Sequence, residues 1–286
     1  GGGHTQFAMV PMNLMKNRKA DYIITGQWAK KAFQEAKMYG DVVAVASSED
    51  KTFSYIPDCS DLPISEDADY VYICVNNTIY GTKFKTLPNT KGNDLVADVS
   101  SCFLSEPMDV SKYALIWGGV QKNIGPAGVV IAIIRDDLVT DDVLEGTPSM
   151  LRYKIHADNK SLYNTPPTYN IYICGKVFKW IKSLGGLDEM KKRNEEKAKI
   201  LYDFLDSSKM FKGTVRKEDR SLMNVPFVTG DKELDAKFVK EAEAKGFVNL
   251  KGHRSVGGMR ASIYNAMPKE GVVKLVEFMK EFEIML

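Results

Sequence analysis

The chain has 286 residues, of which 44% are hydrophobic, so it is long and apolar enough for one large domain or two, each with a real core. Its 39 basic and 37 acidic side chains give a net charge of +2, which offers no indication of nucleic-acid binding, and no apolar run reaches membrane-spanning length. The cysteines lack metal or redox spacing and indicate reduced thiols in a cytoplasmic protein; they are Cys59, Cys74, Cys102 and Cys174.

Apolar segments alternate with helical or loop stretches through the first half of the chain. This alternation is typical of an α/β fold with a mostly parallel sheet covered by helices on both faces. The predicted strands cover residues 42–46, 70–75, 95–99, 114–117 and 129–134, and an amphipathic helix is predicted over 29–38.

The second half of the chain predicts a smaller α/β unit. A helical run over 166–184 ends at Gly185 and Gly186, which is a helix stop signal. Beyond it we expect helices over 187–205, 232–245 and 268–281 and strands over 213–215, 223–228 and 258–262. The predicted organisation is a large domain over residues 1–185 and a small C-terminal domain over residues 186–286.

Three places in the first 80 residues are candidates for ligand binding. Gly3 and His4 stand at a glycine-rich helix start, where backbone amides and the helix dipole favour an anion; a cloning scar is the alternative. Trp28 opens the helix over 29–38 and is placed either to stack on a flat ligand or to anchor that helix in the core. Thr78 follows a strongly apolar strand, at the end where open α/β sheets bind ligands.

The most informative pair is Asp98 and Lys122. Asp98 interrupts a buried strand, and Lys122 lies 24 residues later in a Gly/Pro-rich turn over 118–128, between two apolar strands. Pyridoxal 5'-phosphate (PLP) chemistry needs a carboxylate that keeps the pyridine nitrogen protonated and a lysine that holds the aldehyde as a Schiff base. The alternatives are an ordinary cap or turn aspartate and a surface lysine.

Two further clusters follow. Asn164 and Thr165 precede two prolines, and this is a helix-start pattern with Thr165 as the cap. His253, Arg254 and Arg260 are interleaved with glycines in the pattern His-Arg-Ser-x-Gly-Gly-x-Arg. Because guanidinium groups bind carboxylates and phosphates at two points, this cluster predicts a doubly anionic ligand.

Over segments 96–101, 118–128 and 253–260 the chain resembles the phosphoserine aminotransferases, which are fold-type I, class V PLP enzymes. The resemblance runs along nearly the whole chain. It implies the fold-type I architecture, in which a large domain with a mostly parallel, seven-stranded-type sheet binds PLP and a smaller α/β domain follows. It also implies a homodimer with an active site shared between subunits.

The resemblance implies a role for each candidate residue. Lys122 forms the internal aldimine with PLP and moves the proton, and Asp98 pairs with the ring nitrogen. Arg260 binds the substrate α-carboxylate, and His253 with Arg254 binds the distal anion. The remaining cofactor contacts are Gly3, His4, Trp28, Thr78 and Gln121, with Asn164 and Thr165 reaching the cofactor phosphate of the neighbouring subunit.

The predicted activity is transamination between phosphoserine and 2-oxoglutarate, which yields 3-phosphohydroxypyruvate and glutamate and serves L-serine biosynthesis. Two alternatives stay open: another class V enzyme, such as an alanine–glyoxylate type aminotransferase or a desulfurase, or an inactive fragment that acts as an interaction module. The family carries several dozen residues before the phosphate-binding segment, so we expect an N-terminal companion segment; no metal, nucleic-acid or membrane partner is expected.

Overall fold

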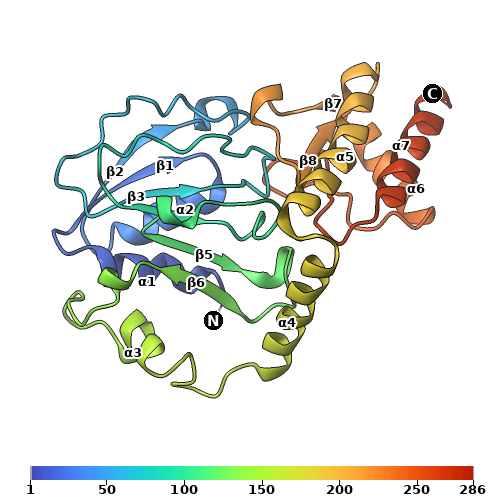
Figure 1. Cartoon of the computed structure of the whole chain (residues 1–286). Coiled ribbons are helices and arrows are strands. Elements are labelled where there is room, and N and C mark those ends of the chain that lie inside the picture. The colour runs from blue at the N-terminus through green and yellow to red at the C-terminus, as the bar shows by residue number, and fades with distance from the viewer. Residues whose placement is uncertain (1, 286) are drawn as a thin grey trace.

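A six-stranded sheet forms the centre of the larger body of the molecule (Figure 1). The computed structural model describes residues 2–285. The strand order is β2-β1-β3-β4-β5-β6, and every neighbouring pair is parallel except β5 and β6. The strands are β1 (Lys19–Ile24), β2 (Asp41–Ser47), β3 (Val71–Cys74), β4 (Leu95–Asp98), β5 (Leu115–Gly119) and β6 (Val130–Ile134). The predicted mostly parallel sheet is confirmed, with six strands supplied by the described part of the chain.

Strand β1 is a strand of this sheet that the sequence did not predict. It begins at Lys19 and contains Asp21, so its apolar run is interrupted. Asp21 is nevertheless buried, because its carboxylate accepts hydrogen bonds from the Ser65 backbone N–H (2.6 Å) and hydroxyl (3.0 Å). A charge that the surrounding fold satisfies in this way cannot be recognised from local hydrophobicity.

Successive residues of the central strands point to opposite faces of the sheet, and each face has its own core. Tyr22 and Tyr72 belong to the core beneath α1 (His4–Leu14) and α2 (Gln27–Ala36). Ile23 and Ile73 belong to the core on the other face, which includes side chains from α4 (Thr168–Ser183) and from the long loops. Both faces are therefore covered, as the buried strands require.

The predicted start of α4 is wrong by two residues. The helix has Pro167 as its N-cap and begins at Thr168, and the Thr165 side chain does not cap it. The physical reason is the pair of prolines: a residue that precedes proline is disfavoured in the helical region, so neither Thr165 nor Pro166 can join the helix readily. Upstream, α3 (Tyr153–Asp158) lies in the loop region that extends away from the sheet at the bottom of Figure 1.

The smaller body, orange to red in Figure 1, is built on an antiparallel sheet in the order β7-β8-β9. Its elements are α5 (Gly186–Ser207), β7 (Lys212–Gly213), β8 (Asn224–Val228), α6 (Lys232–Ala244), β9 (Met259–Ser262) and α7 (Lys269–Ile284). Buried side chains of α5 pack in its core around Phe211, Phe227 and Phe238. The domain boundary near Gly185 stays a prediction.

The loops of both bodies contain short 3-10 helices. They are η1 (Glu49–Lys51), η2 (Val110–Lys112), η3 (Val120–Lys122), η4 (Asp136–Leu138), η5 (Ser149–Leu151) and η6 (Lys217–Asp219). Within residues 2–285, no helix combines the length and the apolar character needed to cross a bilayer.

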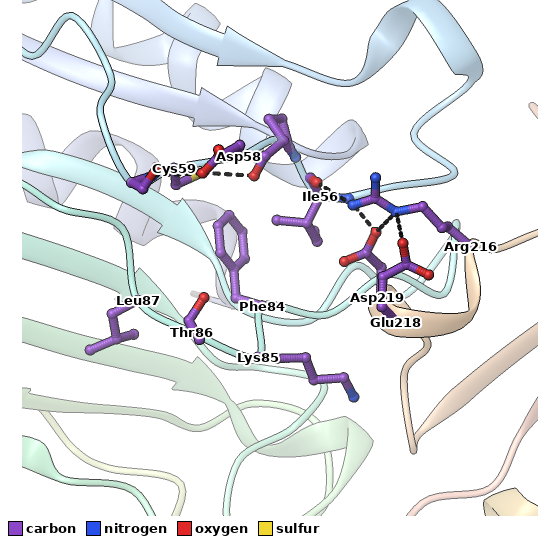
Figure 2. A pocket seen from close by; sticks show the side chains of 12 residues that line it. Ile56, Asp58, Cys59, Phe84, Lys85, Thr86, Leu87, Arg216, Glu218 and Asp219 are labelled. Atoms are coloured by element: carbon purple, nitrogen blue, oxygen red, sulfur yellow. Dashed lines mark hydrogen bonds and ion pairs between the residues drawn. The ribbon is translucent and has the colours of Figure 1, made fainter.

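The two bodies meet at a hydrogen-bonded seam around Ile56 (Figure 2). Arg216 donates to the Ile56 carbonyl at 2.9 Å, and Asp219 accepts from the Ile56 N–H at 3.1 Å. The two side chains are themselves paired at 2.6 Å, beside a cavity of about 500 Å³. Both backbone groups of Ile56 are thus held by the smaller body, so this cavity belongs to the seam and contains none of the predicted site residues.

Lys197 on α5 is a buried lysine whose nearest partners are carbonyls. The residue is only 2% exposed. Its Nζ donates to the carbonyls of Ile263 (3.2 Å), Tyr264 (2.8 Å) and Asn265 (3.4 Å). Burial lowers the pKa of Lys197 from 10.5 to about 8. The folded protein therefore disfavours the charged form of this side chain.

This shift predicts a pH-dependent contribution to stability. Between pH 8 and 10.5 the unfolded state binds more protons at residue 197 than the folded state, so the wild-type free energy of unfolding should rise with pH relative to Lys197→Met. Over that window the difference should grow by about 2–3 kcal/mol. Denaturant unfolding of both proteins at several pH values measures it, and a difference independent of pH would contradict the prediction.

Candidate active site

The loop that carries Lys122 follows a tightly constrained backbone path. Strand β5 ends at Gly119 and leads directly into η3, where the amides of Ile124 and Gly125 both donate to the Val120 carbonyl at 3.0 Å. A side chain at Gly118 would come within 2.7 Å of the Phe103 ring. The glycines therefore let the loop pack against its neighbours, as the sequence predicted.

Lys122 points its amine at two residues that were predicted to contact the cofactor. Nζ donates to Thr78 Oγ1 at 2.8 Å, and it lies 5.6 Å from the centroid of the Trp28 ring. Burial lowers the pKa of Lys122, and the negative charge of Asp98 opposes that shift without cancelling it. The amine is therefore easier to deprotonate than a surface lysine, as a nucleophile or a base requires.

Asp98 stands at the C-terminal end of β4, paired in register with Trp117 of β5. It is buried, and Oδ1 accepts from the Ser100 N–H (2.8 Å) and hydroxyl (2.6 Å). Burial raises the pKa of Asp98, while Lys122 and the Ser100 hydrogen bonds act in the opposite direction. Both Ser100 bonds end on Oδ1, and a cationic ligand atom bound at the second oxygen would stabilise the ionised form.

Ser100 is a site residue that the sequence analysis missed. Its hydroxyl donates to Asp98 and accepts from the Gly119 N–H at 3.0 Å, so it joins the carboxylate to the end of the strand that leads to Lys122. The signal was present in the sequence. An aspartate followed two residues later by serine is typical of a turn in which the carboxylate accepts from that serine.

The start of α1 lies beside the two tryptophans of the site. The His4 ring packs edge-on against Trp28, with 5.3 Å between centroids. A side chain at Gly3 would meet the Trp117 ring at 3.1 Å, so glycine permits this approach. The predicted anion-binding amides of Gly3 and His4 thus border the ring that was predicted to stack, and the His4 imidazole contributes packing.

The cationic cluster approaches from the smaller body. Arg260 lies on β9, and its buried Nε has no hydrogen-bond partner within the described residues. His253 Nδ1 lies 2.7 Å from Ser255 Oγ. Partial burial lowers the pKa of His253, and the positive charges of Arg260, Arg254 and Lys31 add to this effect. The sequence analysis missed Lys31, although it follows Trp28 by about one helical turn and its amine lies 5.1 Å from that ring.

These positive groups are free of ion pairs within residues 2–285. In the part of the chain that the structure describes, none of them is paired with an acidic side chain; the set is Lys31, Lys122, His253, Arg254 and Arg260. The negative charge of Asp98 acts on Lys122, but no ion pair among the described residues neutralises the group, and cations arranged in this way bind anionic ligands. Within residues 2–285 no group of acidic, histidine or cysteine side chains is arranged to hold a metal ion.

Three predicted residues are not brought into contact with the others. Gln121 is exposed, and its side chain folds back toward Gly119. Asn164 and Thr165 are also exposed, and the Asn164 amide donates only to the neighbouring Thr165 carbonyl, at 3.1 Å. The structure of one chain therefore assembles the lysine, the carboxylate, the ring contacts and Arg260, but leaves these three residues at the surface.

The residues present fit PLP. Trp28 offers an aromatic face beside the Lys122 amine, and Asp98 offers a buried carboxylate oxygen for a protonated ring nitrogen. The start of α1 offers backbone amides for a phosphate. Arg260, whose Nε has no partner among the described residues, lies close enough for its positive charge to act on Lys122. Each part of the cofactor thus has a chemically suitable counterpart.

Comparison with known proteins agrees with this fit. The family model described as Aminotransferase class-V matches residues 1–275. A phosphoserine aminotransferase from Nitrosomonas europaea is 55% identical, over 99% of this chain and 79% of its own length. The solved phosphoserine aminotransferase from Bacillus circulans subsp. alkalophilus is 44% identical with a TM-score of 0.97, over 100% of this chain and 79% of that one. The PLP-bound phosphoserine aminotransferase from Trichomonas vaginalis is 39% identical with a TM-score of 0.89, over 98% and 80%.

The chain therefore belongs to the class-V aminotransferases, which depend on PLP. Within that class it belongs to the phosphoserine aminotransferase family, and it spans about 79% of the length of those relatives. The predicted family, fold class and cofactor are confirmed. The alternative enzyme is not supported: a solved alanine–glyoxylate aminotransferase from Nostoc sp. shares the fold, with a TM-score of 0.76, at only 12% identity.

Proposed function

We propose that this protein transfers an amino group between phosphoserine and 2-oxoglutarate, producing 3-phosphohydroxypyruvate and glutamate, with PLP attached to Lys122. One juxtaposition carries the proposal. The depressed-pKa amine of Lys122 lies beside Thr78 and Trp28, next to a buried carboxylate and a group of unpaired cations. A phosphoserine aminotransferase of the same family that is 55% identical supports the same reaction.

The side chains divide the work of the reaction between them. When bound, PLP supplies an aldehyde and an electron-accepting ring. Lys122 would hold the aldehyde and would also take the proton from the substrate Cα, since its lowered pKa leaves more of the amine unprotonated. Asp98 would keep the ring nitrogen in its charged form, and Ser100 fixes the orientation of that carboxylate. Thr78 holds the Lys122 amine at the site.

Different cationic side chains bind the two anionic ends of the substrate. Arg260 extends from β9 with an unpartnered buried Nε and binds the α-carboxylate that every amino-acid substrate carries. His253 and Arg254 bind the distal phosphate or carboxylate. Partial burial and nearby positive charges lower the pKa of His253, so a bound dianion would raise that pKa and favour the charged imidazolium.

We also propose that the protein works as a homodimer in which Asn164 and Thr165 reach the partner's cofactor phosphate. Both residues are exposed and free of contacts to their own site. They lie within a run of exposed apolar side chains that is typical of a covered surface: Leu162, Tyr163, Tyr169, Ile171 and Tyr172. A cytoplasmic location remains part of the proposal and is supported by the four free thiols.

The proposed specificity predicts different results for two arginine variants. Arg254→Ala should lower kcat/KM for phosphoserine by about 30- to 1,000-fold, because a doubly charged group is left unpaired in a partly desolvated pocket. The same variant should use alanine, which lacks a distal anion, within about threefold of wild type. Steady-state kinetics with both amino donors measure the two effects.

Arg260→Ala serves as the comparison, because it should damage phosphoserine and alanine alike. Both donors carry the α-carboxylate that Arg260 is proposed to bind. Equal losses on both donors for Arg254→Ala would contradict the role of Arg254 in selecting phosphoserine. A wild-type protein that transfers amino groups from alanine but not from phosphoserine would overturn the proposed reaction itself.

A further inference from the structure

Three consecutive backbone carbonyls, those of residues 103, 104 and 105, each accept a hydrogen bond from a different buried asparagine. Asn123 Nδ2 donates to the Phe103 carbonyl at 2.7 Å. Asn265 Nδ2 donates to the Leu104 carbonyl at 2.8 Å, and Asn194 Nδ2 donates to the Ser105 carbonyl at 2.9 Å. We call these three side chains, Asn123, Asn194 and Asn265, the asparagine clamp.

The clamp is also bonded within itself. The Asn265 N–H donates to Asn123 Oδ1 at 2.9 Å, and Asn194 Nδ2 donates to Asn265 Oδ1 at 2.9 Å. In Asn123 and Asn265, each amide nitrogen faces a carbonyl and each amide oxygen faces a donor, so the contacts fix the orientation of both amides. All three residues are at least nine-tenths buried. Breaking one bond would leave buried polar groups unpaired.

The gripped segment needs such support, because Leu104 has a φ of 54°. A leucine in the left-handed region is strained and persists only where its surroundings hold it. The segment follows Asp98 by a few residues. One asparagine of the clamp comes from the loop of Lys122, and the other two come from the smaller body. Lys197 adds a second restraint by binding the carbonyls of residues 263–265.

Each member of the clamp lies next to, or on an element packed against, a part of the active site. Asn123 is the residue after Lys122, and Asn265 follows β9, the strand that carries Arg260. Asn194 belongs to α5, whose Lys197 holds the segment after β9. Neither Asn194 nor Asn265 is among the residues predicted to touch cofactor or substrate. Their contacts instead link the supports of Asp98, Lys122 and Arg260 to one another.

We propose that Asn265 is a positioning residue, which, through the asparagine clamp, sets the distance between the Lys122 amine and the Arg260 guanidinium. The proposal rests on the proposed function, since these two groups act on the same substrate molecule there. A substrate held by its α-carboxylate presents its Cα to the lysine only if that distance is right. A displacement of about 1 Å can cost about 100-fold in rate.

The test compares Asn265→Leu with Asn13→Leu in the cofactor-loaded protein. Asn13 is a matched control: it is buried, its Nδ2 donates to the Met9 and Leu151 carbonyls at 2.7 Å, and its Oδ1 accepts from the Tyr153 N–H at 2.9 Å. Each variant replaces a buried side-chain amide with an apolar side chain of similar volume. Asn265→Leu should lower kcat/KM for phosphoserine by about 10- to 100-fold, with kcat reduced, while PLP affinity stays within about threefold. Asn13→Leu should lower only stability.

Hydrogen exchange supplies a readout that does not depend on activity. Amides of residues 102–106 and 119–125 should exchange at least about tenfold faster in Asn265→Leu than in Asn13→Leu. If Asn265→Leu does not fold, Asn194→Leu, which leaves the Leu104 bond in place, is judged on the same readouts. The proposal would be overturned if the clamp variant that is tested, Asn265→Leu or Asn194→Leu, matched Asn13→Leu in both kcat/KM and exchange rates.

The two proposals fail in different ways. If the wild-type protein does not attach PLP to Lys122 or does not use phosphoserine, the proposed function fails before any variant is compared. The exchange experiment would still show whether Asn265 couples the two segments. If the wild-type protein is active and both asparagine variants behave alike, only the positioning role is lost.

Discussion

Replacing Lys122 with alanine should abolish transamination, lowering kcat by at least about 10⁴-fold, since the variant loses both the attachment point and the base. The reason is geometric as well as chemical. Among residues 2–285, Lys122 is the lysine whose amine donates to Thr78, and Lys31 is the other lysine whose amine lies over the Trp28 ring. Borohydride reduction of the wild-type protein followed by peptide mapping should find the cofactor fixed on the peptide that contains Lys122.

Lys85→Ala is the matched control for this experiment. Desolvation of its amine also lowers the pKa of Lys85, to about 8, although the residue as a whole is exposed, and the amine donates to the Arg220 carbonyl at 2.7 Å beside the cavity of Figure 2. A lowered lysine pKa by itself therefore does not define the site, and this variant should retain full activity. Cofactor fixed on any lysine other than Lys122 would refute the assignment.

Replacing Asp98 with asparagine should lower kcat/KM by about 10²- to 10³-fold. Asparagine keeps an oxygen that can accept from Ser100, so the turn should survive, but its amide places a donor where the ring nitrogen needs an anion. Losing a charge-assisted hydrogen bond in a buried site costs about 3–4 kcal/mol. Steady-state kinetics of the folded, cofactor-loaded variant measure the loss.

Asp109→Asn provides the control for the turn itself. Asp109 accepts from the Ser111 N–H (3.1 Å) and hydroxyl (2.6 Å) in the same Asp-x-Ser pattern, but at an exposed position. This variant should keep wild-type kinetics, because its carboxylate faces no ligand. Near-normal turnover in Asp98→Asn would mean that another group serves the ring nitrogen.

The sequence predicted the parts of the site whose signals are local. Asp98 stands out because it interrupts an apolar strand, and Lys122 because it lies in a Gly/Pro-rich turn between two apolar strands. The structure places Asp98 at the end of β4 and Lys122 in η3, directly after the neighbouring strand β5. Strand β1 and the start of α4 were missed or misplaced because their outcome depends on Ser65 and on two successive prolines. Local hydrophobicity does not report either effect.

The asparagine clamp lay beyond any local signal. Asn123, Asn194 and Asn265 each read as an ordinary polar residue, and only the fold brings their amides to one turn. Asparagine has no strong preference for such a buried position, because its cost there depends entirely on which partners the fold supplies. Identifying these residues therefore required the structure, whereas the chemistry of ligand binding could be predicted from the sequence.

The spacing of these contacts along the chain bears on the order in which the site assembles. Asp98, at the end of β4, and Lys122, in η3 after the next strand, are 24 residues apart, whereas Asn123 and Asn265 meet across 142 residues. Closing the longer loop costs about 1–2 kcal/mol more in chain entropy. We therefore expect the half of the site that binds the cofactor to be organised early in folding, and Arg260 to be recruited last. The enzyme would acquire its capacity to bind PLP before it acquires its choice of substrate.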